Sequence, residues 1–496
     1  MNSNNCHFIN GQWVSSKSLL GASTPSLISR DPASGNTIWQ GYPADKEIVD
    51  QAIMAAKKAF PLWSSLELNQ RASYLEMFRE ALLKSKSYLA EIISQSTGKP
   101  LWEAATEVTA MANKITISME SYQARCPESK KQQPQGMSIT THRAHGVMAV
   151  LGPYNFPGHL PNGHIIPALL AGNTIVFKPS ELAPLVAEAT LKCWESCNLP
   201  PGVINMVQGS RDIGQLLSEH EDIDGLLFTG SWNTGRHLAE LMAKTPYKIL
   251  ALEMGGNNPL VIGKITDFKA AAYLTIQSAF LTAGQRCTCA RRLIVPKGST
   301  GDHFVQVLIG MIKTIQVGSY NDKPEPFMGP VITNQAADIL LTAQEKLIGL
   351  GAVPLIPLAR MEKSPAFLSP GLIDVTQVAN LPDEEYFGPF LQIIRVDNFK
   401  VALETANRTK YGLVAGLLSD DPEEYQIFFK TIKAGVINWN TSLTGASSAA
   451  PFGGIGQSGN NRPSAFYAAD YCAYPIASLV SDQLIMPNAI HPGIQI

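Results

Sequence analysis

The feature that most constrains the fold is an alternation of short apolar runs with helical stretches, which begins at Val147. The runs are rich in residues that favour buried strands, and the stretches between them, such as 183–197 and 234–243, have helical patterns. Repetition of strand and helix in this order predicts a doubly wound parallel sheet. The strands expected in this first series are 147–151, 174–177, 203–207, 225–228 and 249–252.

A second series of the same kind follows Gly255-Gly256, where we place a domain boundary. The fold class is therefore expected to be α/β, with two doubly wound units. Its expected strands are 260–262, 292–295, 391–396, 414–418 and 436–439. Its expected helices are 267–281, 301–315, 334–350, 399–407 and 422–432.

The chain before Val147 is expected to be mostly helical. A short β start at 7–14 precedes a helix that Asp45 can cap, and two long helical stretches follow at 68–96 and 101–124. Beyond them, the polar and proline-containing segment 127–135 has the character of a connection. Residues 138–145 alternate as one arm of a hairpin, and the apolar tail from Tyr471 is expected to add a strand to another unit or to a partner subunit.

Charge and cysteine usage exclude several classes of protein. The chain has 39 basic and 41 acidic residues and a net charge of -2, so it lacks the basic excess of a nucleic-acid binder. No apolar stretch approaches the ~20 residues that a membrane span needs. With no signal-peptide pattern at its start, the chain is expected in the cytoplasm. Its seven scattered cysteines are expected to be reduced thiols rather than a disulfide framework.

A candidate nucleophile lies in Gly284-Gln285-Arg286-Cys287-Thr288, after an apolar helical stretch. Glycine permits a close approach of the backbone to a ligand, and Arg286 could favour the reactive thiolate of Cys287. Taken alone, this motif fits a buried structural cysteine better.

Two further motifs follow expected strands, at the sheet edge where such folds place active sites. Glu253, in Leu252-Glu253-Met254-Gly255-Gly256, could act as a general base for water, or it could be a solvated loop carboxylate. Asn155, between Pro153 and Pro157, could donate a hydrogen bond to a developing oxyanion, or it could only satisfy turn backbone groups.

A possible nucleotide site follows two other strands. Lys178 and Glu181, in Phe177-Lys178-Pro179-Ser180-Glu181, are expected at the rim of the first sheet. The stretch 228–235 reads as a strand, a glycine-containing turn and a helix start, and a helix start can bind phosphate. This turn lacks the GxGxxG spacing, so the pattern alone is weak.

Taken together, these motifs resemble the aldehyde dehydrogenase superfamily, in the right order from about Phe8 to Pro475. The resemblance implies a cofactor domain, a catalytic domain and a small oligomerisation arm, and hence a homodimer or higher homo-oligomer. We expect residues 1–125 and 147–256 to bind NAD, 257–440 to be catalytic, 126–146 and 471–496 to form the arm, and 441–470 to return to the cofactor domain. The motifs are PYNFP, FKPSE, FTGSWNTG, LEMGGNNP, GQRCT, EEYFGPF and PFGGIGQSG.

The same resemblance implies roles for individual residues. Cys287 is expected as the nucleophile, Glu253 as the base and Asn155 as the oxyanion donor, with NAD as cofactor and no metal. This sequence departs from many relatives at Tyr154, where they have Trp. Core packing is expected for Cys193, Cys197 and Cys289, which lack metal-site spacing. The residues expected to bind the cofactor are Lys178, Ser180, Glu181, Gly230, Ser231, Trp232, Asn233, Thr234, Gly235, Glu385 and Phe387.

Within the family, the stretch 152–184 resembles the branch that oxidises N-succinyl-L-glutamate 5-semialdehyde to N-succinyl-L-glutamate in arginine catabolism. A small-molecule aldehyde that carries carboxylates is therefore expected, held by cations or backbone N–H groups. The alternatives are a dehydrogenase of another amino-acid-derived semialdehyde and a catalytically silent NAD-binding protein on the same fold. Candidate substrate residues are Arg286, Gly445 and Ala446, with Arg292, His159 and His164 as further candidates.

Overall fold

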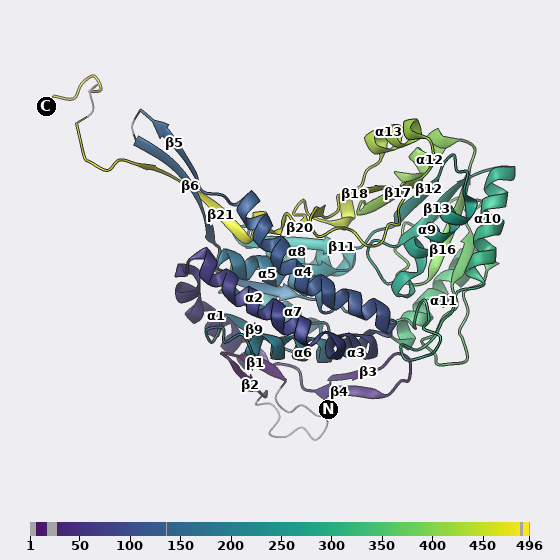
Figure 1. Ribbon diagram of the computed structural model, residues 1–496, viewed down its shortest axis with the longest axis horizontal. Coiled ribbons are helices and arrows are strands. Elements are labelled where there is room, and N and C mark those ends of the chain that lie inside the picture. Colours follow the sequence, from purple (N-terminus) through teal and green to yellow (C-terminus); the bar gives the residue numbers. More distant parts are fainter. Residues whose placement is uncertain (1–5, 17–26, 135, 487–489, 496) are drawn as a thin grey trace.

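The computed structural model describes residues 6–16, 27–134, 136–486 and 490–495, and two large sheets dominate this part of the chain (Figure 1). The first sheet has the strand order β11-β10-β7-β8-β9-β1-β2; its first five strands are parallel, and β1 and β2 add an antiparallel edge. The bounds are β1 His7–Ile9, β2 Gln12–Val14, β7 Val147–Leu151, β8 Thr174–Lys178, β9 Ile204–Met206, β10 Gly225–Gly230 and β11 Ile249–Met254.

Helices cover both faces of this first sheet because its central strands are apolar throughout. Helices α1, α7 and α8 share one apolar core with the sheet, and α2 to α6 share another. Asp45 caps α1 as predicted, since its side chain accepts from the Ile48 N–H at 2.9 Å. The bounds are α1 Lys46–Ser65, α2 Leu68–Lys84, α3 Lys86–Thr97, α4 Leu101–Arg125, α5 His159–Ala171, α6 Pro184–Glu195, α7 Arg211–Glu219 and α8 Trp232–Met242.

The second sheet has the order β14-β15-β16-β13-β12-β17-β18, and only its edge strand β14 is antiparallel. Helices α9 to α11 pack on one face and α12 and α13 on the other. The strands are β12 Asn258–Ile262, β13 Ala290–Pro296, β14 Val353–Ile356, β15 Gly371–Asp374, β16 Phe390–Val396, β17 Val414–Leu418 and β18 Val436–Trp439. The helices are α9 Phe268–Phe280, α10 Ser299–Ile312, α11 Asn334–Gly349, α12 Phe399–Ala406 and α13 Pro422–Thr431.

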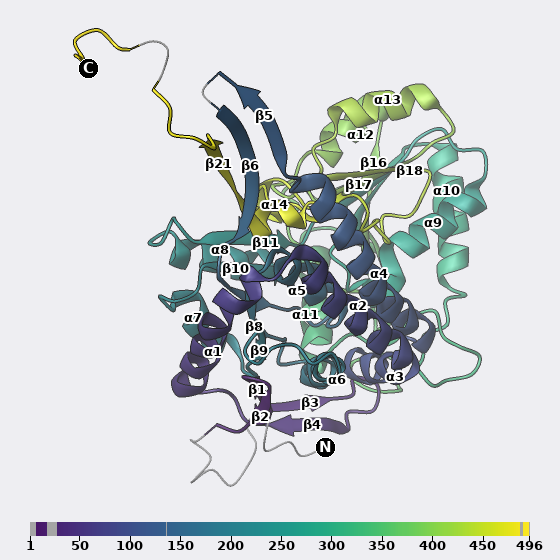
Figure 2. The same cartoon turned by 60° about the vertical axis from the view of Figure 1, so that its left-hand side comes forward.

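A third, antiparallel sheet projects from the body as an arm (Figures 1 and 2). It consists of β5 (Ser129–Gln133), β6 (Gly136–Ala144) and β21 (Ala473–Val480), and β21 pairs with β6 along its whole length. The tail strand expected after Tyr471 is therefore present, and it pairs within its own chain. The short helix α14 (Ala468–Cys472) leads into it.

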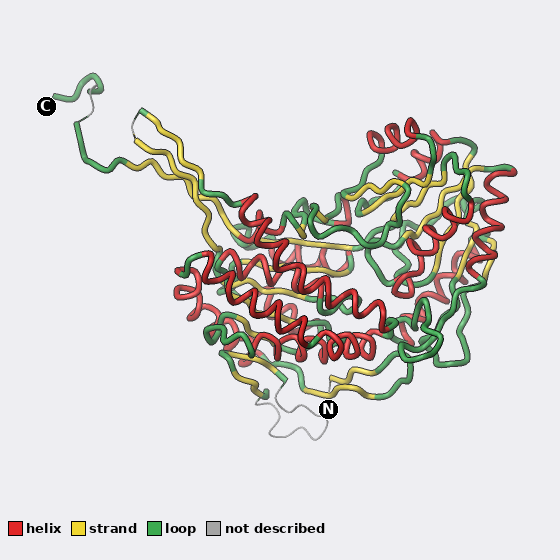
Figure 3. Tube along the Cα trace, in the orientation of Figure 1, coloured by secondary structure: helices red, strands yellow, loops and turns green. Residues whose placement is uncertain are grey.

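Two sequence expectations were wrong in detail, and several strands were not expected; Figure 3 shows how helices and strands are distributed along the trace. The expected connection 127–135 contains β5, whose sequence SKKQQ is polar because both of its faces are exposed. The single helix expected over 68–96 is two, α2 and α3, which meet at Ser85. Strands β14 and β15 were not expected, nor was the hairpin of β3 (Leu27–Arg30) and β4 (Thr37–Gly41).

The two large units meet along the chain at Gly255-Gly256, between β11 of the first sheet and β12 of the second. Fold class is thus as predicted, a mixed α/β chain with two parallel-sheet units. Within the described residues, no helix combines the length and apolar character needed to cross a membrane. Parts of the expected domains, namely residues 1–5, 17–26, 135, 487–489 and 496, lie outside the described residues.

Candidate active site

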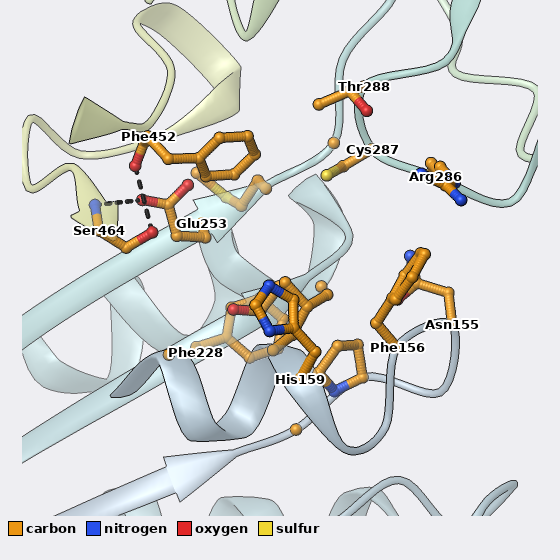
Figure 4. A pocket seen from close by; sticks show the side chains of 18 of the residues that line it. Asn155, Phe156, His159, Phe228, Glu253, Arg286, Cys287, Thr288, Phe452 and Ser464 are labelled. Atoms are coloured by element: carbon orange, nitrogen blue, oxygen red, sulfur yellow. Dashed lines mark hydrogen bonds between the residues drawn. The ribbon is translucent and has the colours of Figure 1, made fainter. Parts of the chain in front are cut away.

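A cavity of about 520 Å³ lies at the carboxyl ends of the first sheet's strands and is lined on another side by segments from the second unit. Its lining includes Asn155 after β7, Thr229 in β10, Glu253 in β11 and Cys287 before β13. The side chains of Asn155, Glu253 and Cys287 surround one space in Figure 4. Three motifs that are far apart in sequence therefore meet, as expected for a parallel sheet with its site at the strand ends.

The Cys287 loop is held by buried polar side chains. Arg291, which is fully buried, donates to the carbonyl oxygens of Gly284 at 2.7 Å and Arg286 at 2.9 Å. Asn258 donates to the carbonyl oxygen of Cys287 at 2.7 Å. Gly284 has φ +70°, and a Cβ there would collide with the backbone of Gly388, so glycine is required. This support fixes the thiol at the cavity wall.

Burial, together with the nearby carboxyl groups of Glu385 and Glu253, raises the pKa of the Cys287 thiol to about 12, against a smaller opposite effect of Arg291. The expectation that Arg286 favours the thiolate is wrong in this arrangement. The Arg286 guanidinium pairs instead with the buried carboxylate of Glu103 at 2.6 Å. Its charge is therefore largely neutralised beside Cys287.

Glu253 lies near the end of β11 and faces the thiol across the cavity (Figure 4). Its Oε1 accepts from the Ser464 N–H at 3.1 Å, while its Oε2 is buried and has no hydrogen-bond partner among the described residues. Burial raises the pKa of Glu253 well above its ordinary value. A carboxyl group with one free oxygen and a raised pKa is suited to take a proton from water.

Asn155 is buried, and its side-chain amide donates to the Gln285 carbonyl oxygen at 2.9 Å. Its own carbonyl oxygen accepts from Lys99 Nζ at 2.7 Å, and Lys99 is paired with Glu107 at 2.7 Å. The amide nitrogen carries two hydrogens, so one remains for a ligand in the cavity. The prolines around Asn155 indicated a fixed loop, but no sequence pattern indicated the Lys99–Glu107 pair that anchors it.

The cofactor-side residues divide into two groups. Lys178 donates to the Pro179 carbonyl oxygen at 2.9 Å and lies 3.6 Å from the Glu181 carboxylate. Five of the expected residues do not line the cavity, although each is within two positions in sequence of a residue that does: Lys178, Glu181, Trp232, Asn233 and Gly235. The expected residues that do line it are Ser180, Gly230, Ser231, Thr234, Glu385 and Phe387.

The geometry at these positions fits a dinucleotide. Ser231 caps α8, so the N-terminus of that helix opens beside the cavity where it can face a phosphate. Glu385 accepts from the Gly256 N–H at 3.1 Å, and burial raises the pKa of its carboxyl group. The Glu385 carboxyl group packs against the backbone at Gly255, where any Cβ would collide with it. Glycine at this position therefore allows the carboxyl group to lie at the cavity wall. Its other oxygen is available to a ligand hydroxyl.

The comparisons with known proteins agree with this arrangement. Residues 20–474 match the family model described as the aldehyde dehydrogenase family. The chain belongs to the aldehyde dehydrogenase family. It is 52% identical over 487 residues to N-succinylglutamate 5-semialdehyde dehydrogenase of Escherichia coli strain K12, with 98% of each chain covered. A protein of the same name from Shigella flexneri is also 52% identical, with the same coverage.

Solved structures of other aldehyde dehydrogenases have the same fold. Betaine aldehyde dehydrogenase from Staphylococcus aureus, in complex with NAD⁺, is 26% identical and superposes with a TM-score of 0.90, covering 99% of this chain and 97% of its own. NADP-dependent glyceraldehyde-3-phosphate dehydrogenase from Bacillus halodurans, complexed with NADP, is 27% identical with a TM-score of 0.88, covering 97% and 99%.

The candidate substrate residues of this aldehyde dehydrogenase have different surroundings. Arg286, Gly445, Ala446 and His159 line the cavity. His164 also lines it, but its ring nitrogens are within hydrogen-bond distance of Tyr471 Oη at 2.9 Å and Thr229 Oγ1 at 3.0 Å. The further candidate Arg292 was wrong, because its guanidinium is buried and donates only to backbone carbonyl oxygens, those of Asn257, Thr405 and Ala406.

Several lining residues were missed from the sequence, namely Lys114, Phe156, Ser448, Phe452 and Ser464. Lys114 lies within α4, in a helical pattern that gives no signal of a site. Cys193, Cys197 and Cys289 are buried, as expected for core positions. In the described ranges, no group of three or more His, Cys, Asp or Glu side chains is placed to hold a metal ion.

Proposed function

We propose that this aldehyde dehydrogenase oxidises N-succinyl-L-glutamate 5-semialdehyde to N-succinyl-L-glutamate with NAD⁺, in arginine catabolism. The observation that carries the chemistry is the meeting of Cys287, Glu253 and Asn155 in one cavity. The substrate follows from the 52% identity to curated relatives of that name over 98% of the chain.

In the proposed mechanism, the Cys287 thiol loses its proton to solvent and its sulfur adds to the aldehyde carbon, while the carbonyl π electrons move to oxygen and a thiohemiacetal oxyanion forms. The substrate oxygen then accepts hydrogen bonds from the Asn155 side-chain amide and the Cys287 backbone N–H, donors of a kind worth roughly 10²–10³ in rate each. NAD⁺, when bound, supplies the acceptor for the hydride that leaves the substrate carbon. The resulting thioester remains on Cys287, which divides one difficult step into two easier ones.

Glu253 completes the reaction by taking a proton from water, whose oxygen attacks the thioester carbon and displaces the Cys287 thiolate. Free acid is therefore the expected product, because an enzyme that passes its acyl group to coenzyme A has less need of a water activator. The unpartnered Oε2 of Glu253 supports this role. Detection of acyl-CoA in preference to free acid would count against it.

We propose NAD rather than NADP because Glu181 has a carboxylate on the adenosine side, where it would repel a 2′-phosphate. Lys178 lies 3.6 Å from that carboxylate and partly offsets it. The roles of Ser180, Gly230, Ser231, Trp232, Asn233, Thr234 and Gly235 near the phosphates, and of Glu385 and Phe387 near the nicotinamide ribose, are part of the same proposal. A higher kcat/KM with NADP⁺ would show that the charge argument is wrong.

We keep the expected domain division as part of the proposal, together with the arm of 126–146 and 471–496 as a self-association element. Apolar side chains exposed near its end, such as Leu479 and Val480, support contact with another copy of the chain in a homodimer or larger homo-oligomer. We propose the cytoplasm as its location because the substrate is an intermediate of amino-acid degradation.

One assay tests the proposal against its alternatives. The protein is mixed with NAD⁺ and a panel of semialdehydes, NADH is followed, and the acid product is identified. We expect the highest kcat/KM with the succinylated substrate. A higher value with an unsuccinylated semialdehyde would identify a different dehydrogenase, and no turnover with any aldehyde would indicate a silent NAD-binding protein.

A further inference from the structure

Lys114 is a buried cation in the wall of the active-site cavity. Its side chain extends from the interior of α4 and is only 3% exposed. Its ammonium group donates to Ser448 Oγ at 2.9 Å, which joins α4 to the loop that also contains Gly445 and Ala446. The cation therefore lies where a ligand in the cavity can reach it.

Lys114 has no carboxylate partner among the described residues. The nearby buried lysine Lys99 differs in this respect, since it forms an ion pair with Glu107 at 2.7 Å. Burial, with no charged group offsetting it, lowers the pKa of Lys114 to about 8. A buried ammonium without an anion costs folding free energy, so its retention in the wall of a cavity calls for a ligand that supplies the missing charge.

The titratable groups near Lys114 leave its positive charge uncompensated. Burial and the charge of Lys114 together lower the pKa values of His159 and His164 to about 3, so both imidazoles are neutral and do not compensate for Lys114. The two carboxyl groups in the lining, Glu253 and Glu385, instead act on the Cys287 thiol. Charge is thus divided, with acids beside the nucleophile and a lone cation on α4.

We propose that the Lys114 ammonium, assisted by the Ser448 hydroxyl, binds a carboxylate of the aldehyde substrate and so sets the enzyme's preference for anionic aldehydes. Ser448 accepts a hydrogen bond from Lys114 and keeps its own hydroxyl hydrogen for the same carboxylate. The inference rests on the proposed function for the substrate's identity, but its chemistry requires only an aldehyde with a carboxylate.

Four aldehydes with the same reacting end test the inference. N-Succinylglutamate 5-semialdehyde has two carboxylates. N-Acetylglutamate 5-semialdehyde keeps only the α-carboxylate, N-succinyl-4-aminobutanal keeps only the succinyl carboxylate, and N-acetyl-4-aminobutanal has neither. Their kcat and KM values are measured for the wild type and for Lys114→Met, which removes the charge and retains most of the length. Lys114→Arg keeps the charge, and Lys264→Met removes an exposed lysine as a matched control.

For Lys114→Met we expect kcat/KM to fall by about 10- to 100-fold, mainly through KM, on every aldehyde that has the contacted carboxylate. The neutral aldehyde should change by less than about twofold, and Lys114→Arg should retain most of the preference. The single-carboxylate substrates then identify which carboxylate is bound. An equal loss on all four aldehydes, or no loss on any, would overturn the inference.

A binding measurement separates this inference from the proposed function. The product N-succinylglutamate should raise the thermal midpoint of the wild type and of Lys264→Met, but raise that of Lys114→Met much less. If the wild type oxidises the acetylated substrate better than the succinylated one, the proposed substrate is wrong, while a selective loss in Lys114→Met still supports Lys114 as the carboxylate site. Equal protection of Lys114→Met and the wild type by every carboxylate ligand would contradict it.

Discussion

The buried charged side chains in the first half of α4 have partners of opposite charge, whereas the buried lysine in its second half has none among the described residues. Glu103 and Glu107, in the first two turns, each have a cation from another part of the chain. Lys114, two turns later, has only the hydroxyl of Ser448. The difference teaches that buried charges with partners fix the loops of this site, whereas the buried charge without one faces the space that the substrate fills.

The paired half of α4 contacts both the Asn155 loop and the Cys287 loop. Glu107 accepts from the backbone N–H groups of Gly158 at 2.9 Å and His159 at 3.1 Å, while its partner Lys99 donates to the Asn155 carbonyl oxygen. Glu103 accepts from Arg286, next to the nucleophile, and from the hydroxyl of Thr282. One helix face therefore positions Asn155 and Cys287, the proposed oxyanion donor and nucleophile, relative to each other.

The largest effect on stability and activity is expected for a change at Glu107. Glu107→Ala leaves Lys99 buried and unpaired, which should cost about 3–5 kcal/mol of folding free energy and lower kcat because the Asn155 loop loses its support. Thermal unfolding measures the loss of folding free energy, and steady-state kinetics measure the fall in kcat. Glu76→Ala, which breaks the partly exposed Glu76–Arg79 pair, is the control and should cost under about 1 kcal/mol. If both variants lost the same folding free energy, the buried Lys99–Glu107 pair would contribute no more to stability than a surface pair, and the comparison would be wrong.

A second, smaller effect is expected at Glu103. Glu103→Gln releases the Arg286 charge beside Cys287, so the thiol pKa should fall and alkylation by iodoacetamide should begin at lower pH. In the wild type, with the Cys287 pKa raised to about 12, alkylation should keep rising with pH across the alkaline range. Mass spectrometry of the Cys287 peptide measures the rates. An unshifted profile in Glu103→Gln would mean that Arg286 does not act on the thiol even when unpaired.

The smallest effect is expected when Lys114 is replaced, and it concerns the folding stability of the ligand-free enzyme. The folded-state pKa is about 8, below the ordinary 10.5, so below pH 8 the folded chain contains a buried charge and is penalised. That penalty disappears as pH rises from 8 towards 10.5. Lys114→Met should therefore be at least as stable as the wild type at pH 7, and its relative advantage should shrink at higher pH. A variant that is less stable at pH 7 would indicate a structural role for the lysine.

The sequence predicted those parts of the molecule that depend on local pattern. The parallel strands of both sheets, with the exception of β15, and the cap at Asp45 follow from apolar patterning and helix-start chemistry. Glu253 and Asn155 were singled out because each ends or follows a strand within a family motif, and Cys287 because its family motif follows an apolar helical stretch. Strand β5 was missed because a strand exposed on both faces has no apolar alternation.

Contacts between distant segments were not predictable in the same way. The bond from Lys99 to Asn155 joins residues 56 positions apart, and that from Lys114 to Ser448 joins residues 334 apart. Nothing in the composition of α4 distinguishes a lysine that reaches a cavity from one that lies on a solvated face. For the same reason, Arg292 looked like a substrate ligand although its guanidinium is enclosed by backbone carbonyl groups.

The reacting groups come from the strand ends and their loops, whereas Lys114 comes from a helix packed beside them. Chemistry and selectivity are thus encoded in separate stretches of the gene. A change of one codon in α4 can redirect the enzyme to a new aldehyde while the machinery that oxidises it is inherited intact.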